Sequence, residues 1–214
     1  MSNKDKLVTQ ESALLGREEK MLITELHYVN QTDLTAAKPH ASQEVILGLG
    51  CFWGAERVFW QLDGVLSTSV GYSGGWTPNP TYQEVCTGQT GHAEVVRIIF
   101  DPKIITLQDL LAVFWEKHDP TQGMRQGNDI GTQYRSVIFT ENNEDLVIAQ
   151  RSLQTYQQAL GEALGKTITT EVAMMKDYYL AETYHQQYLA KNPQGYCGIG
   201  GTGVCFPPSL TGEA

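Results

Sequence analysis

The sequence predicts a mixed α/β protein: an α+β two-layer sandwich on a ferredoxin-like split βαβ core, with an appended helix, an appended strand and a glycine-rich C-terminal tail. Three observations predict this fold. Periodic segments follow one another as strand–helix–strand–strand–helix–strand over 44–139. No repeat or linker divides the 214 residues, which can bury one sizeable core. Hydrophobic residues make up 41% and charged residues 18%, as in ordinary globular proteins.

The first half of the core follows from apolar runs and turn residues. The apolar run at 44–49 predicts a short buried strand, and the apolar spacing after it predicts a helix at 52–62. Residues 65–72, rich in Val, Ser and Thr, and residues 92–100 predict two more strands. The stretch 73–91 is a loop crowded with Gly, Pro, Thr and Tyr, and a loop this long in a compact domain is usually functional.

The second half begins at a helix start signal, in which Thr106 is the N-cap and Asp109 its N3 partner. The elements expected from there are a helix ending at Asp119-Pro120, a glycine-rich loop at 121–133, a strand at 134–139, a long amphipathic helix capped by Gly165, a strand at 167–174 and a short helix at 181–190.

The remaining segments flank this core. We expect residues 1–43 to form an N-terminal arm wrapping the α/β domain at 44–192, and residues 193–214 to form a mobile C-terminal tail, with one structural domain in all. A formal charge of −9 and the lack of a Lys/Arg cluster argue against nucleic acid as a partner. No apolar run approaches the roughly 20 residues of a membrane span, and no secretory signal begins the chain, so we expect a cytoplasmic protein. No pattern suggests an interface, so we expect a monomer.

The segment Gly50-Cys51-Phe52-Trp53-Gly54 lies where a predicted strand ends and a predicted helix begins. Unpaired N–H groups and the helix dipole favour a thiolate there, which would make Cys51 a reactive nucleophile. The alternative is a packed thiol, because free cysteine is among the most buried residue types.

The other cysteines are Cys86, Cys197 and Cys205, and no C-x-x-C pair occurs. Cys197 and Cys205 lie in a tail rich in glycine and poor in side chains that could hold a core. We interpret them as a thiol pair carried to an oxidised partner, because an attacking thiolate must line up with the sulfur that it displaces. They could also be incidental thiols. Cys86 is most simply a packed or surface thiol.

Glu94 is the candidate general acid. Side chains alternate between the two faces of the predicted strand at 92–100, so Glu94 lies on the core-facing side with Val96, Ile98 and Phe100. Arg97 lies on the other face, which is the more solvent-exposed one. Desolvation there would raise the pKa of Glu94 and keep it protonated. Alternatively, Glu94 lies in water past the sheet edge or pairs with an arginine.

Further polar candidates are Tyr82, Asp129 and Tyr134, which lie in or beside the two long loops. Taken singly, each would more simply be a solvated loop residue.

These motifs together resemble the peptide methionine sulfoxide reductase A family. The blocks that carry the resemblance are GCFWG at 50–54, GYSGG at 71–75, PTY at 80–82, GHAE at 91–94, GNDIGTQYRS at 127–136, HQQYL at 185–189 and GYCG at 195–198. The long arm and the second tail cysteine look like the bacterial three-cysteine branch. The resemblance spans about Ile46 to Cys205.

The resemblance implies that Cys51 attacks the sulfoxide sulfur while Glu94, helped by Tyr82 and Tyr134, protonates the sulfoxide oxygen. It also implies that Asp129 shapes the polar side of the site. Phe52 and Trp53 would then turn outward as the wall that receives the methyl group, although helical spacing alone places Phe52 in the core. The family acts on the S epimer of methionine sulfoxide, free or in proteins, as protein repair after oxidative damage.

For turnover, the resemblance implies that Cys197 condenses with a sulfenic acid on Cys51. Cys205 would then take over the disulfide with Cys197, and thioredoxin, or dithiothreitol in vitro, would reduce it. No metal or other cofactor is expected. Two rival functions stay open at this point: a cysteine-dependent hydrolase or acyl transferase using one of His92, His118 and His185, and a zinc-binding module holding the metal through the four cysteines.

Overall fold

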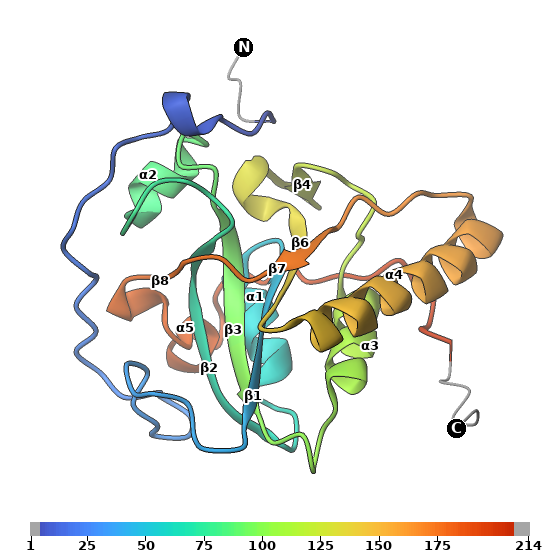
Figure 1. Ribbon diagram of the computed structural model, residues 1–214, viewed down its shortest axis with the longest axis horizontal. Helices are drawn as coiled ribbons and strands as arrows, with labels where there is room; N and C mark the ends of the chain where they lie inside the picture. Colours follow the sequence, from blue (N-terminus) through green and yellow to red (C-terminus); the bar gives the residue numbers. More distant parts are fainter. Residues whose placement is uncertain (1–4, 208–214) are drawn as a thin grey trace.

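The computed structural model describes residues 5–207. Residues 1–4 of the expected arm and 208–214 of the expected tail lie outside this range. The main sheet of the described residues has six strands in the order β7-β6-β1-β3-β2-β8 (Figure 1). These strands are β1 (Gln43–Leu49), β2 (Val65–Ser73), β3 (Ala93–Phe100), β6 (Ser136–Thr140), β7 (Glu171–Met174) and β8 (Tyr178–Leu180).

The four central strands form the split βαβ core. β3 lies between β1 and β2 and pairs antiparallel with both, and β6 pairs antiparallel with the other edge of β1. α1 (Phe52–Phe59) leads from β1 to β2, and α3 (Leu107–Lys117) follows β3. The long helix α4 (Asn143–Leu164) then leads to β7, which pairs parallel with β6. The predicted core with its appended helix and strand is therefore confirmed.

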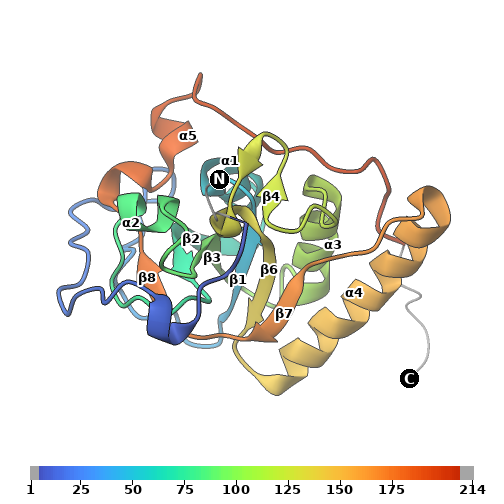
Figure 2. The same ribbon diagram turned by 90° about the horizontal axis from the view of Figure 1, so that it is seen from above.

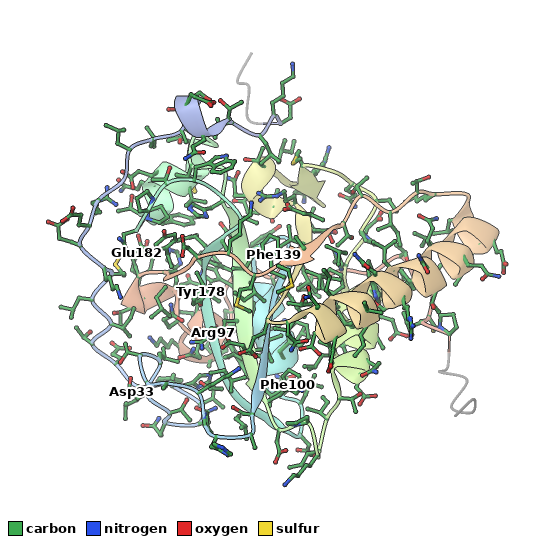
Figure 3. The ribbon with its side chains drawn as sticks, viewed as in Figure 1. Asp33, Arg97, Phe100, Phe139, Tyr178 and Glu182 are labelled. Carbon is green, nitrogen blue, oxygen red and sulfur yellow. The ribbon has the colours of Figure 1, made fainter. Side chains whose placement is uncertain are left out.

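The main hydrophobic core lies between the sheet and the helices α1, α3 and α4, which cover the same face (Figures 1 and 2). Val96, Ile98 and Phe100 of β3 point into this core, as the alternation predicted. On the opposite face, Arg97 pairs with Glu44 and lies over the ring of Tyr178 at 5.9 Å from its centroid (Figure 3). Position 94 therefore belongs to the face that α1 covers.

The two long predicted loops contain short regular elements. α2 (Tyr82–Cys86) begins with a capping box, in which Thr81 accepts from the Glu84 N–H at 3.3 Å and the Glu84 carboxylate accepts from the Thr81 N–H at 2.8 Å. The second loop holds the small hairpin of β4 (Arg125–Gln126) and β5 (Asp129–Ile130). Sequence reasoning missed these elements because each is too short to establish a hydrophobic period.

The region after α4 differs more from expectation. The predicted strand at 167–174 is regular only from Glu171, and β8, which was not predicted, pairs with β2. The predicted helix at 181–190 is divided into a 3₁₀ turn, Thr183–His185, and the short helix α5 (Tyr188–Lys191). Gln187 causes the break, because it adopts the left-handed conformation, with φ 48° and ψ 40°.

The N-terminal residues from 5 to 42 run along one side of the domain (dark blue, Figure 1). Arg17 forms an ion pair with Glu84 at 2.5 Å, which ties this segment to α2. Further along, the buried ring of His27 shares a hydrogen bond with the Thr68 hydroxyl at 3.0 Å. Within residues 5–207, no helix is both long and apolar enough to cross a membrane.

Candidate active site

Cys51 is the N-cap residue of α1, directly after the central strand β1. Gly50 makes the tight turn between them with φ +91°, and a Cβ there would lie 2.7 Å from the side chain of Gln126. The Ala55 N–H donates to the Cys51 carbonyl at 3.3 Å, which starts the helix. The predicted position of Cys51 at the strand–helix junction is therefore correct, and its side chain is partly buried.

The predicted thiolate is wrong for the resting site. Burial is the main cause that raises the pKa of Cys51 far above its usual range, and an ionised Glu94 would raise it further. The backbone N–H groups of Trp53 and Gly54 lower the pKa, as the helix terminus predicts, but they do not outweigh burial. Cys51 is therefore a neutral thiol at neutral pH.

Glu94 lies on β3 under the first turn of α1, with a residue exposure of only 1%. The Phe52 N–H donates to its Oε2 at 3.1 Å. Desolvation raises the pKa of Glu94 to about 8; the charge of Asp129 adds to this, and the Phe52 N–H opposes it. Glu94 thus carries its proton at neutral pH. The alternatives of a solvated or arginine-paired Glu94 are wrong.

Tyr82 and Tyr134 bring phenol groups to Glu94 from the two loops. Tyr82 is the first residue of α2, and its N–H donates to Glu182 at 2.8 Å. Burial raises the pKa of both tyrosines, and for both the second cause is the charge of Glu94. Both phenols therefore stay protonated and can donate hydrogen bonds beside Glu94.

Phe52 and Trp53 differ in orientation. Phe52 is 1% exposed and packs among Tyr72, Tyr82 and His185, so the expectation that it turns outward is wrong. The Phe52 side chain points into the core because Phe52 lies on the same buried face of α1 as Ala55 and Phe59. Trp53 is only partly buried.

Two residues of the HQQYL block, His185 and Tyr188, orient Trp53; sequence reasoning considered His185 only as a base for the rival hydrolase and gave Tyr188 no role. The Trp53 indole N–H donates to His185 Nδ1 at 2.9 Å, and the indole stacks on Tyr188 with centroids 3.9 Å apart. Burial lowers the pKa of His185 to about 4, so its ring is neutral. The HQQYL motif was the only sign in the sequence that these residues matter. Neither hydrophobic periodicity nor charge indicated that they contact Trp53.

A second buried carboxyl, Glu56, holds the next turn of α1 and was also missed. It accepts from the Thr68 hydroxyl at 3.0 Å and from both the backbone and side-chain nitrogens of Gln187, at 2.8 and 2.7 Å. Burial raises the pKa of Glu56 to about 7. This network fixes the left-handed conformation of Gln187, which precedes Tyr188. It therefore helps to position the Tyr188 ring on which Trp53 stacks.

Asp129 connects the site to the C-terminal segment. It lies on β5, and the Tyr196 hydroxyl donates to its Oδ2 at 3.1 Å. Next to Tyr196, the Arg57 guanidinium of α1 donates to Cys197 Sγ at 3.0 Å. The structure therefore brings Cys197 against the helix that begins at Cys51.

From Cys197 the chain continues past α1 and α3 towards α4 (red, Figure 2). Tyr156 of α4 donates to the Val204 carbonyl at 2.9 Å, and the Phe206 N–H donates to Glu116 of α3 at 2.7 Å. The view that this segment lacks anchoring side chains is wrong, since Val204 and Phe206 pack on the main core. Cys205 between them is exposed.

The geometry disfavours both rival functions. His92 and His118 use their ring nitrogens on other groups, and Trp53 occupies Nδ1 of His185, so none of them hydrogen-bonds to Cys51 as an activating base. Among residues 5–207, no group of three or more His, Cys, Asp or Glu side chains could hold a metal ion. Within the described residues, the four cysteines are not gathered into such a group.

Comparison with known proteins identifies the family. Residues 43–202 match the family described as peptide methionine sulfoxide reductase. The chain belongs to this family. It is 67% identical over 212 residues to the peptide methionine sulfoxide reductase MsrA of Vibrio parahaemolyticus, a match covering 99% of this chain and 100% of that one. The chain is accordingly an oxidoreductase that reduces methionine sulfoxide.

Solved structures agree with this assignment. Methionine sulfoxide reductase A of Corynebacterium diphtheriae matches with a TM-score of 0.85 and 43% identity, over 95% of this chain and 99% of that one. Mxr1 of Saccharomyces cerevisiae, solved in complex with Trx2, matches with a TM-score of 0.50 and 25% identity, over 72% of this chain and 91% of that one. The expected family and fold are both confirmed.

The raised pKa of Glu94 in this reductase predicts a pH-dependent stability. In the folded protein Glu94 holds this proton up to a pKa of about 8, whereas an ordinary carboxyl releases it at 4.5, so the stability of the fold falls as pH rises between these values. Glu94→Gln removes this penalty. Its free energy of unfolding relative to wild type should rise from pH 5 to pH 8, by at most about 1.4 kcal/mol per pH unit.

Urea denaturation at several pH values would measure this difference. Glu162→Gln, at an exposed position of α4, is the control and should show a flat difference. A flat difference for Glu94→Gln as well would contradict a protonated Glu94.

Proposed function

We propose that this reductase acts on the S epimer of methionine sulfoxide, free or in proteins, with Cys51 as nucleophile and Glu94 as general acid. The observation that carries the proposal is a buried, protonated Glu94 under the helix terminus that presents Cys51. A sulfoxide sulfur is a poor electrophile until its oxygen is protonated. The site supplies that proton from a carboxyl buried away from solvent, where electrostatic effects are strong.

The neutral Cys51 thiol fits this chemistry. When Glu94 gives its proton to the sulfoxide oxygen, it becomes a carboxylate that can accept the thiol proton of Cys51. The thiolate then forms only when substrate is present, and it attacks the substrate sulfur. The net result is that a thiol and a sulfoxide become a sulfenic acid on Cys51 and methionine, with the oxygen atom transferred to Cys51. Tyr82 and Tyr134 donate hydrogen bonds to the sulfoxide oxygen.

Chirality follows from two unlike sides of the site. Trp53, held by His185 and Tyr188, forms the apolar wall for the methyl group, with the buried ring of Phe52 behind it. Asp129 provides the polar side, through water and the substrate amide. When the sulfoxide oxygen is held at Glu94, the substrate can place its methyl group against Trp53 and its main chain beside Asp129 in only one of the two epimers.

Thiols complete the cycle, as in the three-cysteine type. Cys197 condenses with the Cys51 sulfenic acid, and Cys205 then attacks Cys197 and releases Cys51. Thioredoxin reduces the resulting disulfide, and Cys205 is exposed enough to reach it. The complex of the yeast relative with Trx2 supports this partner. Electrons arrive through thiols, so the cycle needs no further cofactor. We propose that the protein works as a cytoplasmic monomer.

A mixture of the two methionine sulfoxide epimers with dithiothreitol tests the substrate class. We expect the enzyme to consume the S epimer and leave the R epimer, as measured by chiral chromatography. Cys51→Ser, the control, should consume neither. Consumption of both epimers at similar rates would contradict the proposed two-sided site.

The acid role of Glu94 predicts a slow first step in Glu94→Gln. Methionine formation in a single turnover should fall by roughly 10²- to 10⁴-fold, the usual contribution of a general acid. The wild-type rate should also decline as pH rises through about 8, where Glu94 loses its proton, and this decline should vanish in the variant. Rapid-quench measurements at several pH values would determine both. A near-wild-type rate with an unchanged pH profile would remove Glu94 from the mechanism.

A further inference from the structure

One side of α1 carries three residues spaced three apart: Cys51, Gly54 and Arg57. Residues at this spacing are neighbours along a helix surface. Cys51 is the N-cap of the helix, and Gly54 and Arg57 follow three and six residues later. The chain around Cys197 lies on this row.

Gly54 makes the close approach of that chain possible. A Cβ at position 54 would lie 2.6 Å from the side chain of Ile199 and 3.1 Å from Cys197 Sγ. Any larger residue would push both groups away from the helix. The absent side chain therefore lets the Cys197 sulfur rest on the first turn of α1, the turn that Cys51 begins.

Arg57 contacts that sulfur directly. Its guanidinium donates to Cys197 Sγ at 3.0 Å in a partly buried position. Among residues 5–207, no acidic side chain forms an ion pair with Arg57, so its charge is not matched by a carboxylate. A guanidinium donates most strongly to an anionic partner, and the thiolate is the nucleophilic form of cysteine.

We propose that Arg57 is a catalytic residue of the second chemical step, in which Cys197 forms a disulfide with oxidised Cys51. The proposal rests on the proposed function. In this step the Cys197 sulfur supplies the electron pair, the S–S bond forms and the S–O bond of the Cys51 sulfenic acid breaks. The thiol proton of Cys197 leaves with the hydroxide as water. Arg57 stabilises the charge on Cys197 as it attacks, and takes no part in methionine formation.

The test uses the full chain with Cys205→Ser, so that the reaction stops at the disulfide between Cys51 and Cys197. Into this parent we introduce Arg57→Met, which keeps the length of the side chain without its charge, and Arg57→Lys, which keeps the charge. Arg151→Met, at an exposed position of α4, is the control. Thermal unfolding verifies that each variant is folded.

Two rates are measured after mixing with one equivalent of methionine sulfoxide: methionine formation and the loss of free thiols. Dimedone traps any sulfenic acid that persists. We expect methionine to form at the parent rate in every variant. Disulfide formation should slow by roughly tenfold to a hundredfold in Arg57→Met, as for the loss of a hydrogen bond to a charged group, and dimedone labelling of Cys51 should increase. Arg57→Lys should fall between parent and Arg57→Met.

Three results would overturn the role of Arg57. Unchanged disulfide formation in Arg57→Met is one, and an equal slowing of methionine formation is another. The third is an equal loss in the Met and Lys variants, because that would indicate packing and not charge. A parent that forms no methionine at all would instead contradict the proposed function, and the role of Arg57 with it.

Discussion

The hydrogen bond from the Phe52 N–H to the Glu94 carboxyl is the interaction on which the site depends. It joins the start of α1 to β3, at the centre of the sheet. It fixes the position of a buried carboxyl, and burial favours the neutral form although the N–H itself favours the charged one. Glu94 and Cys51 both retain their protons in the resting protein, and ionisation of Glu94 would raise the cost of ionising Cys51. In the proposed mechanism the site therefore delivers a proton before it generates a nucleophile.

α1 carries residues proposed for each part of the reaction. Its N-cap is Cys51, the proposed nucleophile, Trp53 on its first turn is the proposed wall, and Arg57 on the next turn donates to the sulfur of Cys197. Buried polar contacts fix the helix in place: Glu56 accepts hydrogen bonds from both β2 and Gln187. The sheet and the C-terminal segment therefore orient the same helix from two sides.

The sequence predicted the core of the fold because strand alternation and helical spacing are strong between 44 and 139. The same alternation placed Glu94 correctly, since side chains in a strand have a strict period of two. It could not predict the pairings that depend on distant segments, such as β8 with β2 or Arg57 with Cys197. The ionisation of Cys51 was mispredicted for the same reason: a helix terminus is visible in a sequence, whereas the depth of burial that outweighs it depends on tertiary packing.

A protonated Glu94 in the resting protein at neutral pH is directly visible by infrared difference spectroscopy. The spectrum of Glu94→Gln at pH 7 is subtracted from that of the wild type. The difference isolates Glu94 from the other carboxyls with a pKa raised by burial, among them Glu56, whose pKa is about 7. We expect a protonated-carboxyl C=O band that disappears as pH rises through about 8. A carboxylate band already present at pH 6 would contradict this expectation.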